Sequence, residues 1–331
     1  MTENFMHEMA LMNRQNIGLS IILPIYNDAI AVSRFLPQLF AFTAQLAMKT
    51  EIIMVDDGSK DDLVKIYQEN LTSKPDNTTL RLIQFSRNFG KEAALTAGLT
   101  ESRGELVTMM DADGQHPITV LAQMLTTIHN NTVDVVAAVQ NSRDNETALA
   151  RVLKKCFYCF MQDTHRYNLT PNAGDFRLMK RKVVDAILQL PERQRFMKGL
   201  YAWVGFSTIF IPFQAEPRKA GNSKFNYISL FELALIGITS FSQRPLRWIS
   251  RTGMILSLIA IIYGLYIVFD TLIFGKDLAG WPTLAAGIMF STGLQLVCLG
   301  LIGEYIGRIY EEVKHRPLYV INKEWDSSEN Q

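Results

Sequence analysis

The chain has 331 residues and a formal net charge of +1, so its overall charge gives no reason to expect a nucleic-acid partner. This length accommodates two domains, or one domain with an appendage. Up to about residue 225 the composition is mixed and typical of a soluble domain, and beyond that point the apolar content rises sharply. We therefore expect a soluble domain followed by a part that contacts a lipid bilayer.

The three cysteines are too few for a disulfide framework. Two of them form the run Cys156-Phe-Tyr-Cys159, which lies among aromatic and basic residues. This setting favours a reduced, packed pair on a helix over a redox motif. Residues 1–17 lack a basic start followed by an apolar core, so we predict a loose N-terminal tail and no signal peptide.

Short apolar runs alternate with helical segments in the first half of the chain. The predicted strands are 18–27, 51–59, 80–85, 105–110 and 133–139, with helices between them. Strands that alternate with helices favour right-handed crossovers and a mostly parallel, doubly wound α/β sheet.

Polar side chains collect where four of these strands end. They are Asn27, the pair Asp56 and Asp57, Arg87, and the pair Asp111 and Asp113. Ligands of an open α/β sheet bind beyond the carboxyl ends of its strands, so we expect these groups around one crevice. Asp-x-Asp occurs by chance in many loops, but at such a rim it suits a hard divalent cation that bridges to a diphosphate.

The chemistry of this edge suits a nucleoside diphosphate. Asp56 or Asp57 can accept a hydrogen bond from a base N–H or a ribose hydroxyl. Arg87 and Lys91 supply positive charge, and the start of a helix at 91–101 offers free N–H groups to an anion. The chain has neither a Gly-x-Gly-x-x-Gly run after the first strand nor a P-loop, which disfavours a dinucleotide dehydrogenase and a P-loop ATPase.

Four runs carry a family resemblance: Pro24-Ile-Tyr-Asn27, Val55-Asp-Asp-Gly-Ser59, Ser86-Arg-Asn-Phe-Gly-Lys91 and Asp111-Ala-Asp-Gly-Gln115. In order and spacing they resemble the inverting family 2 glycosyltransferases of the GT-A fold. Later runs are similar to the polyprenyl-phosphate branch: Asn172-Ala-Gly-Asp175-Phe-Arg177, Leu190-Pro-Glu-Arg193-x-x-Phe-Met-Lys-Gly199, Arg218-x-x-Gly-x-Ser223-Lys224-Phe225 and Gly303-Glu-Tyr-Ile-Gly-Arg308. The likeness covers about residues 18–320 and is closest to bactoprenol glucosyltransferases. Gly114 replaces the usual Leu, which should loosen that turn.

The resemblance implies a role for each matching position. Mg²⁺ or Mn²⁺ would be held by Asp113 and Gln115. The catalytic set would be Asp175, as the catalytic carboxylate or at least the one that orients the acceptor, with Asp111 and Arg177. The donor nucleotide would be bound by Pro24, Tyr26, Asn27, Asp56, Asp57, Arg87, Lys91, Asp111, Ala112 and Asp113. The acceptor phosphate would meet Arg218, Ser223 and Lys224, with Arg177 near the two phosphate groups.

Two alternatives without a catalytic or binding role remain for these positions. Asp175 could be a helix cap before Phe176, and Arg218 with Lys224 could form a solvated or lipid-facing basic patch. A lipid phosphate is already an oxyanion near neutral pH, so its attack needs little help from a base. Cations that offset the charge of two phosphate groups matter more.

The C-terminal third is expected to lie on and across a membrane. Segment 226–248 has a broken apolar stripe and basic and aromatic anchors, which is typical of a helix in the headgroup layer, although a buried core helix also fits. Two apolar stretches, 252–274 and about 283–303, can each span a hydrocarbon core of about 30 Å. Basic residues flank this pair on both outer sides, so the positive-inside rule predicts a hairpin with cytoplasmic ends.

The predicted organisation is a tail at 1–17, a GT-A domain at 18–225, interfacial helices at 226–248, a transmembrane hairpin at 249–309 and a cytoplasmic tail at 310–331. The resemblance implies transfer of a hexose, with glucose favoured, from a UDP-sugar to undecaprenyl phosphate. This would occur on the cytoplasmic face of a bacterial inner membrane, for O-antigen or other surface-glycan modification. Related enzymes suggest a homotetramer.

Three alternatives stay open. The donor could be UDP-GlcNAc, UDP-aminoarabinose or GDP-mannose. A processive polysaccharide synthase is disfavoured, because Gln243-Arg-Pro-Leu-Arg247-Trp248 is one residue longer than the Gln-x-x-Arg-Trp motif of synthases and two spans are too few for a polymer channel. An inactive membrane scaffold is disfavoured by the intact Asp111, Asp113, Gln115 and Asp175.

Overall fold

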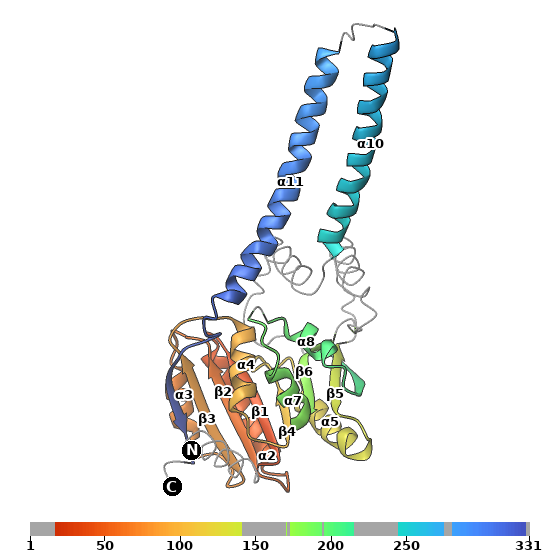
Figure 1. The fold of residues 1–331 in the computed structure, drawn as a ribbon. Helices are drawn as coiled ribbons and strands as arrows, with labels where there is room; N and C mark the ends of the chain where they lie inside the picture. Colours follow the sequence, from red (N-terminus) through yellow and green to blue (C-terminus); the bar gives the residue numbers. More distant parts are fainter. Residues whose placement is uncertain are drawn as a thin grey trace, which may run out of the picture.

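The structure is a computed structural model that describes residues 17–140, 170, 173–193, 195–214, 244–274 and 280–328. An α/β domain with helices on both faces of one sheet carries two long helices, which project from one end of it (Figure 1). The interfacial segment 226–243 and the linker 275–279 lie outside the described residues.

The described residues form one eight-stranded sheet in the order β7-β5-β6-β4-β1-β2-β3-β8. The strands are β1 (Leu19–Ile25), β2 (Thr50–Asp56), β3 (Thr78–Phe85), β4 (Leu106–Met109), β5 (Val135–Gln140), β6 (Ala173–Lys180), β7 (Thr208–Phe213) and β8 (Ile321–Asp326). β1 is parallel to both β2 and β4, β2 is parallel to β3, and β5 is parallel to β7. The antiparallel pairs are β4 with β6, β5 with β6, and β3 with β8. The predicted mostly parallel sheet is confirmed.

Helices cover both faces of the sheet, and the side-chain alternation of β1 shows why. Ile21 and Leu23 pack into the core under α2 (Ala29–Thr43), α3 (Leu63–Asn70) and α5 (Ile118–Asn130), whereas Ile22 packs under α4 (Lys91–Glu101), α7 (Arg181–Leu188) and α8 (Met197–Trp203). A Cβ at Gly98 would lie 2.2 Å from Ile22 Cγ2, so α4 rests on β1 only because this residue is glycine.

Three strands were not predicted: β6, β7 and β8. β6 has Asp175 and Arg177 on one face and the buried Phe176 and Leu178 on the other. This alternation of charged and apolar residues is a strand pattern that the prediction, based on continuous apolar runs, did not use. Asp175 lies inside a strand, so the alternative that it caps a helix before Phe176 is wrong.

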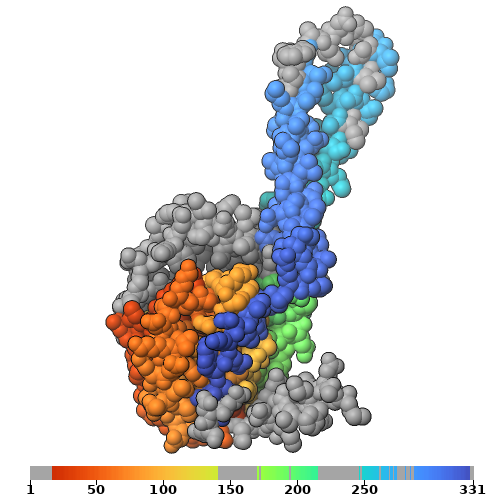
Figure 2. All heavy atoms as spheres, turned by 90° about the vertical axis from the view of Figure 1, so that its left-hand side faces the viewer, coloured from red at the N-terminus to blue at the C-terminus, as the bar shows by residue number. Residues whose placement is uncertain are grey.

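The segment predicted as a C-terminal tail supplies an edge strand of the sheet. β8 pairs antiparallel with β3, and the Ser327 backbone N–H donates to the carbonyl of Leu80 at 3.1 Å. In the turned view of Figure 2 this blue segment runs from the long helices down the side of the domain. The α/β domain therefore includes residues from both sides of the long helices.

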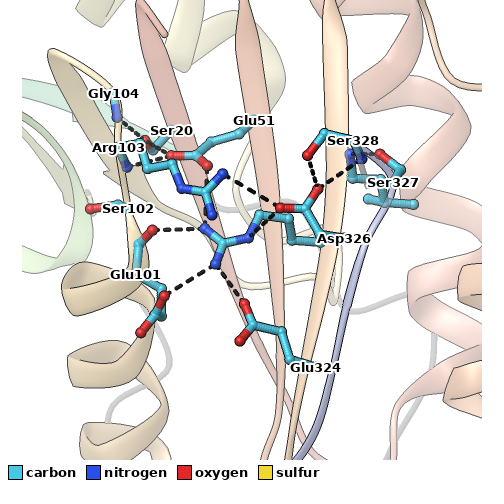
Figure 3. A network of polar contacts seen from close by, with 12 residues as sticks. Ser20, Glu51, Glu101, Ser102, Arg103, Gly104, Glu324, Asp326, Ser327 and Ser328 are labelled. Atoms are coloured by element: carbon cyan, nitrogen blue, oxygen red, sulfur yellow. Dashed lines mark hydrogen bonds and ion pairs between the residues drawn. The ribbon is translucent and has the colours of Figure 1, made fainter. Parts of the chain in front are cut away.

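A buried cation joins β8 to the sheet. Arg81 on β3 is 1% exposed, and four carboxylates converge on its guanidinium, two from β8 and one each from β2 and α4. Figure 3 labels these four acidic residues. They are Glu324 at 2.6 Å, Glu101 at 3.1 Å, Asp326 at 3.4 Å and Glu51 at 3.6 Å. Burial would lower the pKa of Arg81, but these carboxylates outweigh it and raise the pKa, so the guanidinium stays charged.

The two long helices are α10 (Arg244–Phe274) and α11 (Trp281–Val313). Each contains a stretch long and apolar enough to cross a membrane, at Trp248–Ile267 and Gly287–Val313, and these stretches are not buried within the protein. Residues 244–248, predicted as part of the interfacial segment, are continuous with α10. α11 runs past the predicted end of the second span at 303, as far as Val313.

Replacement of Arg81 by Met should destabilise the α/β domain strongly. Glu51, which is fully buried, would lose its compensating charge, and removal of one partner of a buried ion pair costs about 3–5 kcal/mol. We expect the unfolding temperature of the purified protein in detergent to fall by about 10 °C. The control is Lys65→Met, which removes an exposed pair with Glu69 and should shift it little. Equal shifts for the two variants would contradict the role given to Arg81.

Candidate active site

The carboxyl ends of β1, β2 and β4 border a cavity of about 220 Å³. Its lining includes five of the residues predicted to bind a donor: Pro24, Tyr26, Asp57, Lys91 and Asp111. Side chains that are far apart in sequence thus meet at the edge of the sheet where α/β proteins bind ligands.

Lys91 lies between two carboxylates at this cavity. Its Nζ is 2.6 Å from Oδ1 of Asp111 and 3.6 Å from Oδ2 of Asp175. Partial burial would lower the pKa of Lys91, but Asp111 and Asp175 outweigh it and raise the pKa. One ammonium group therefore links the turn after β4 to strand β6 and partly offsets two negative charges.

Asp175 keeps one oxygen uncommitted. Its Oδ1 is buried and has no hydrogen-bond partner among the described residues, while Oδ2 faces Lys91. A buried carboxylate oxygen without a partner is costly, so it marks a place where a ligand group or a cation completes the site.

The turn that follows β4, residues 111–116, is the aspartate turn. Gly114 in it has φ +79°, in the left-handed region that favours glycine, so this departure from the family pattern has a local backbone reason. Oδ1 of Asp113 accepts the backbone N–H of Gln115 at 3.0 Å. Asp111 faces the cavity described above, whereas Ala112 and Asp113 face a neighbouring cavity of about 230 Å³.

His116 fixes this turn to β6, a role that the sequence analysis did not assign. Its Nδ1 accepts the backbone N–H of Asp111 at 2.9 Å, and its ring stacks on Phe176 with the centroids 4.6 Å apart. Burial lowers the pKa of His116, which keeps the ring neutral and Nδ1 able to accept. The only sequence signal was its position directly after Gln115.

Asp56 and Asp57 organise the wall of the cavity. Asp57 is 3% exposed and accepts the backbone N–H groups of Phe89 at 2.6 Å and Gly90 at 2.9 Å, which fixes the loop before α4. Burial raises the pKa of Asp57, although the two backbone hydrogen bonds oppose the shift. Asp56 is buried and accepts from the Ser59 backbone and the Gln84 amide, so of the two only Asp57 reaches the cavity.

Two other predicted donor residues, Asn27 and Arg87, lie outside the cavity lining. Asn27 has φ +51°, and its side-chain oxygen accepts the Lys60 backbone N–H at 2.9 Å, so it shapes the turn after β1. Arg87 is exposed, and its guanidinium lies 4.1 Å from the centroid of the Phe89 ring. Arg87 is not part of the cavity lining in this conformation.

Arg177 lies behind Asp175 and not in an open cavity. It is 7% exposed, its guanidinium carbon is 3.6 Å from the centroid of the Tyr201 ring, and Nη2 donates to the carbonyl of Gly174 at 2.7 Å. Burial lowers the pKa of Arg177. Asp175 lies two residues earlier on the same face of β6, and the charges of Arg177 and Asp175 attract each other. Arg177 therefore acts on the site by way of Asp175. The predicted acceptor residues Arg218, Ser223 and Lys224 lie outside the described residues.

Glu92 is a second residue that the sequence analysis missed. Its Oε2 accepts the backbone N–H of Met197 at 3.1 Å and so joins the start of α4 to the start of α8. Burial raises the pKa of Glu92 from 4.5 to about 7, and the nearby charge of Asp175 adds to the shift. Its position beside Lys91 was the only signal in the sequence.

A mostly parallel sheet with carboxylates and cations around a cavity at its carboxyl edge defines an α/β enzyme. Residues 20–188 match the family model of glycosyl transferase family 2, and residues 244–309 match the GtrB C-terminal hairpin. A glycosyltransferase of Synechocystis sp. is 42% identical over 93% of this chain and 96% of its own length. The chain therefore belongs to glycosyl transferase family 2.

Other relatives share nearly the full length. The bactoprenol glucosyl transferase of Shigella phage SfV is 40% identical over 92% of this chain and 98% of its own. The prophage bactoprenol glucosyl transferase homolog of Escherichia coli strain K12 is 38% identical over the same shares. The family resemblance drawn from the sequence motifs is confirmed, and the chain is a glycosyltransferase.

Glu92 should make stability depend on pH in a defined direction. Because its pKa is raised in the folded protein, the folded state binds this proton more tightly than the unfolded chain, and stability falls as the pH rises from 4.5 to about 7. Glu92→Gln keeps an acceptor for Met197 without titrating. We expect a smaller loss of unfolding temperature between about pH 5 and about pH 8 in this variant than in the wild type. The exposed Glu69→Gln should follow the wild type, and parallel curves for Glu92→Gln would contradict this assignment.

Proposed function

We propose that this glycosyltransferase moves a hexose, with glucose favoured, from a UDP-sugar to undecaprenyl phosphate with inversion at the anomeric carbon. The observation that carries the proposal is the position of Lys91 between Asp111 and Asp175 at the cavity. Its support is the 40% identity, over nearly the full length, to relatives named for glucosyl transfer to bactoprenol. The sugar and the nucleotide rest on that likeness.

The donor cavity has chemistry for a nucleoside diphosphate. Tyr26 is 49% exposed and offers a ring face to a base, while Asp57 holds the Phe89–Gly90 backbone that forms the wall. Lys91 stands at the first position of α4, where its ammonium group and the helix N-terminus both favour an anion. A diphosphate placed there would also approach Asp111.

The aspartate turn has the donor set for Mg²⁺ or Mn²⁺. The described residues contain no cluster of three or more His, Cys, Asp or Glu, so the protein itself would supply few ligands. That fits a hard cation held by one or two carboxylates together with substrate phosphates. Asp113 and Gln115 would hold it, and when bound it would neutralise charge that develops on the departing diphosphate.

The chain's own residues then have distinct tasks. Oδ1 of Asp175, which has no hydrogen-bond partner among the described residues, orients the acceptor, and the positive charge of Arg177 behind it limits its repulsion of a phosphate. Lys91 offsets charge on the diphosphate. A phosphate oxygen of the acceptor bonds to the anomeric carbon, and the bond from that carbon to UDP breaks with its electron pair leaving on UDP. No proton transfer is needed, since the attacking phosphate is already ionised.

The sheet supports a membrane hairpin with both ends on one side. The α/β domain contains strands before α10 and, in β8, a strand after α11. A chain that leaves this domain and returns to it must cross a bilayer an even number of times, in accord with the two candidate spans. We place the domain on the cytoplasmic face of a bacterial inner membrane, where nucleotide sugars are available. The homotetramer stays a prediction.

The rival functions fit less well. A processive synthase would need a polymer channel, and the described residues contain only two candidate spans. An inactive scaffold would have no reason to keep the charged set of Lys91, Asp111 and Asp175 together.

Metal removal tests the aspartate turn. We expect excess chelator to abolish transfer of labelled glucose from UDP-glucose to undecaprenyl phosphate, and Mg²⁺ or Mn²⁺ to restore it. Asp113→Ala should reduce turnover by at least about a hundredfold with the fold retained, because a metal ligand is lost. The matched control is Asp62→Ala, an exposed aspartate that makes no side-chain cap to α3. Full turnover in chelator would refute the metal assignment.

Asp175→Asn separates chemistry from donor binding. The amide keeps the size of the side chain but removes the negative charge, so we expect turnover to fall by about tenfold to a hundredfold. The calorimetric affinity for UDP should stay within about twofold, because Asp175 does not line the donor cavity. The control is Asp185→Asn on the exposed side of α7. Loss of UDP affinity with unchanged turnover at saturation would instead place Asp175 in the donor site.

A further inference from the structure

The end of the second membrane helix touches a loop of the α/β domain. The Glu312 carboxylate on the last turn of α11 accepts the backbone N–H of Arg193, at 3.0 and 3.3 Å to its two oxygens. The Arg193 guanidinium donates to the carbonyl of Arg316 and lies 3.5 Å from Nδ1 of His315. We call this set of four residues the helix–loop junction. Arg193 belongs to the run 190–199, to which neither the sequence nor the proposed mechanism gave a task.

This loop leads directly into the wall of the active site. Four residues after Arg193, the Met197 backbone donates to Glu92, the neighbour of Lys91. Met197 and Leu200 are fully buried against the core, and Tyr201 lies over the guanidinium of Arg177. In Figure 1 the loop before α8 passes below the lower end of α11. Thus α8 contacts the site on one side and is connected to the membrane helix on the other.

A second attachment fixes the chain that follows α11 to the sheet. Tyr319 stacks on Phe85 with the ring centroids 4.9 Å apart and the planes 10° from parallel, and β8 then joins the sheet. With α11 fixed to the sheet through β8, a contact between Glu312 and Arg193 sets where the loop and α8 stand relative to the membrane. The donor cavity, lined from β1, β2 and α4, does not include residues of this junction.

We propose that the helix–loop junction is a positioning device for the lipid acceptor. It holds α8, and with it Arg177 and Asp175, at a fixed distance from the membrane surface. At this distance a polyprenyl phosphate headgroup reaches the anomeric carbon. This role rests on the proposed function. Only the acceptor arrives along the membrane, whereas the sugar nucleotide enters from water. Damage to the junction should therefore affect use of the lipid and spare donor binding.

The test compares neighbouring glutamates on α11 in the full-length protein, reconstituted in phospholipid vesicles that contain undecaprenyl phosphate. Glu312→Ala removes the acceptor of the Arg193 N–H. Glu311→Ala removes an equal charge one residue away, on an exposed side chain that pairs only with Lys314 among the described residues. Glu312→Gln keeps an oxygen that can accept the N–H. For each variant the measurements are KM and kcat for the lipid, the Kd for UDP, and the unfolding temperature.

We expect Glu312→Ala to raise the KM for undecaprenyl phosphate, or to lower kcat/KM for it, by about tenfold, the scale set by loss of one charge-assisted hydrogen bond. The Kd for UDP should stay within about twofold, Glu312→Gln should recover most of the loss, and Glu311→Ala should resemble the wild type. Arg193→Ala, which removes the side-chain contacts to residues 315 and 316 but keeps the backbone N–H, should produce a smaller defect of the same kind.

The outcomes distinguish the two levels of proposal. A wild-type protein that does not glycosylate undecaprenyl phosphate would overturn the proposed function, and this role with it. An active wild type with unchanged lipid kinetics in Glu312→Ala would overturn the junction's role alone. So would a Glu312→Ala protein that loses UDP affinity and thermal stability in proportion to its lipid defect, because that pattern belongs to a general structural contact.

Discussion

A single buried guanidinium holds the edge strand β8 on the sheet and joins segments that are far apart in the chain. Arg81 reaches Glu324, which lies 243 residues later, and the intervening chain includes Lys91, Asp111 and Asp175 of the active site and both long helices. A buried ion pair usually contributes little net stability, because desolvation of the charges offsets their attraction. The charges instead specify the native pairing, because an uncompensated Arg81 or Glu51 would be severely unfavourable inside the domain. The location of β8, and therefore of the end of α11, follows from this requirement.

The active site also contains a cation held between carboxylates, but this cation is less buried than Arg81. Lys91 is 46% exposed and sits between Asp111 and Asp175, so the site without substrate already contains the counter-ion that a diphosphate would need. Around it, Asp57 fixes the loop before α4, His116 fixes the aspartate turn, and Glu92 fixes α8. These three side chains shape the site by accepting hydrogen bonds from backbone N–H groups, which fixes the course of the backbone around Lys91.

The sequence predicted the parts of this arrangement that follow from local pattern. The strands β1 to β5 are apolar runs that alternate with helices, so a mostly parallel sheet could be inferred. Polar residues at the ends of four predicted strands indicated the ligand edge, and the motif spacing indicated family 2. β6 was missed because its apolar residues alternate with Asp175 and Arg177 and do not form a continuous run, and β8 was missed because its partner is distant in sequence. No local pattern shows that Asp56 faces inward while Asp57 reaches the cavity, since that depends on the loop around Ser59 and Gln84. Nor does a local pattern show that the Tyr201 ring covers the guanidinium of Arg177, since that depends on where α8 packs.

The edge of the sheet has a consequence for the biogenesis of the protein. Synthesis proceeds from the N-terminus, so β3 emerges from the ribosome long before β8, and both long helices are made in between. During that interval β3 presents an unpaired edge next to a guanidinium that lacks two of its four carboxylates. Unpaired edges are sites of misassembly and chaperone capture. Completion of the catalytic domain is thus delayed until both long helices have been synthesised, which couples its maturation to the synthesis of the two candidate membrane spans.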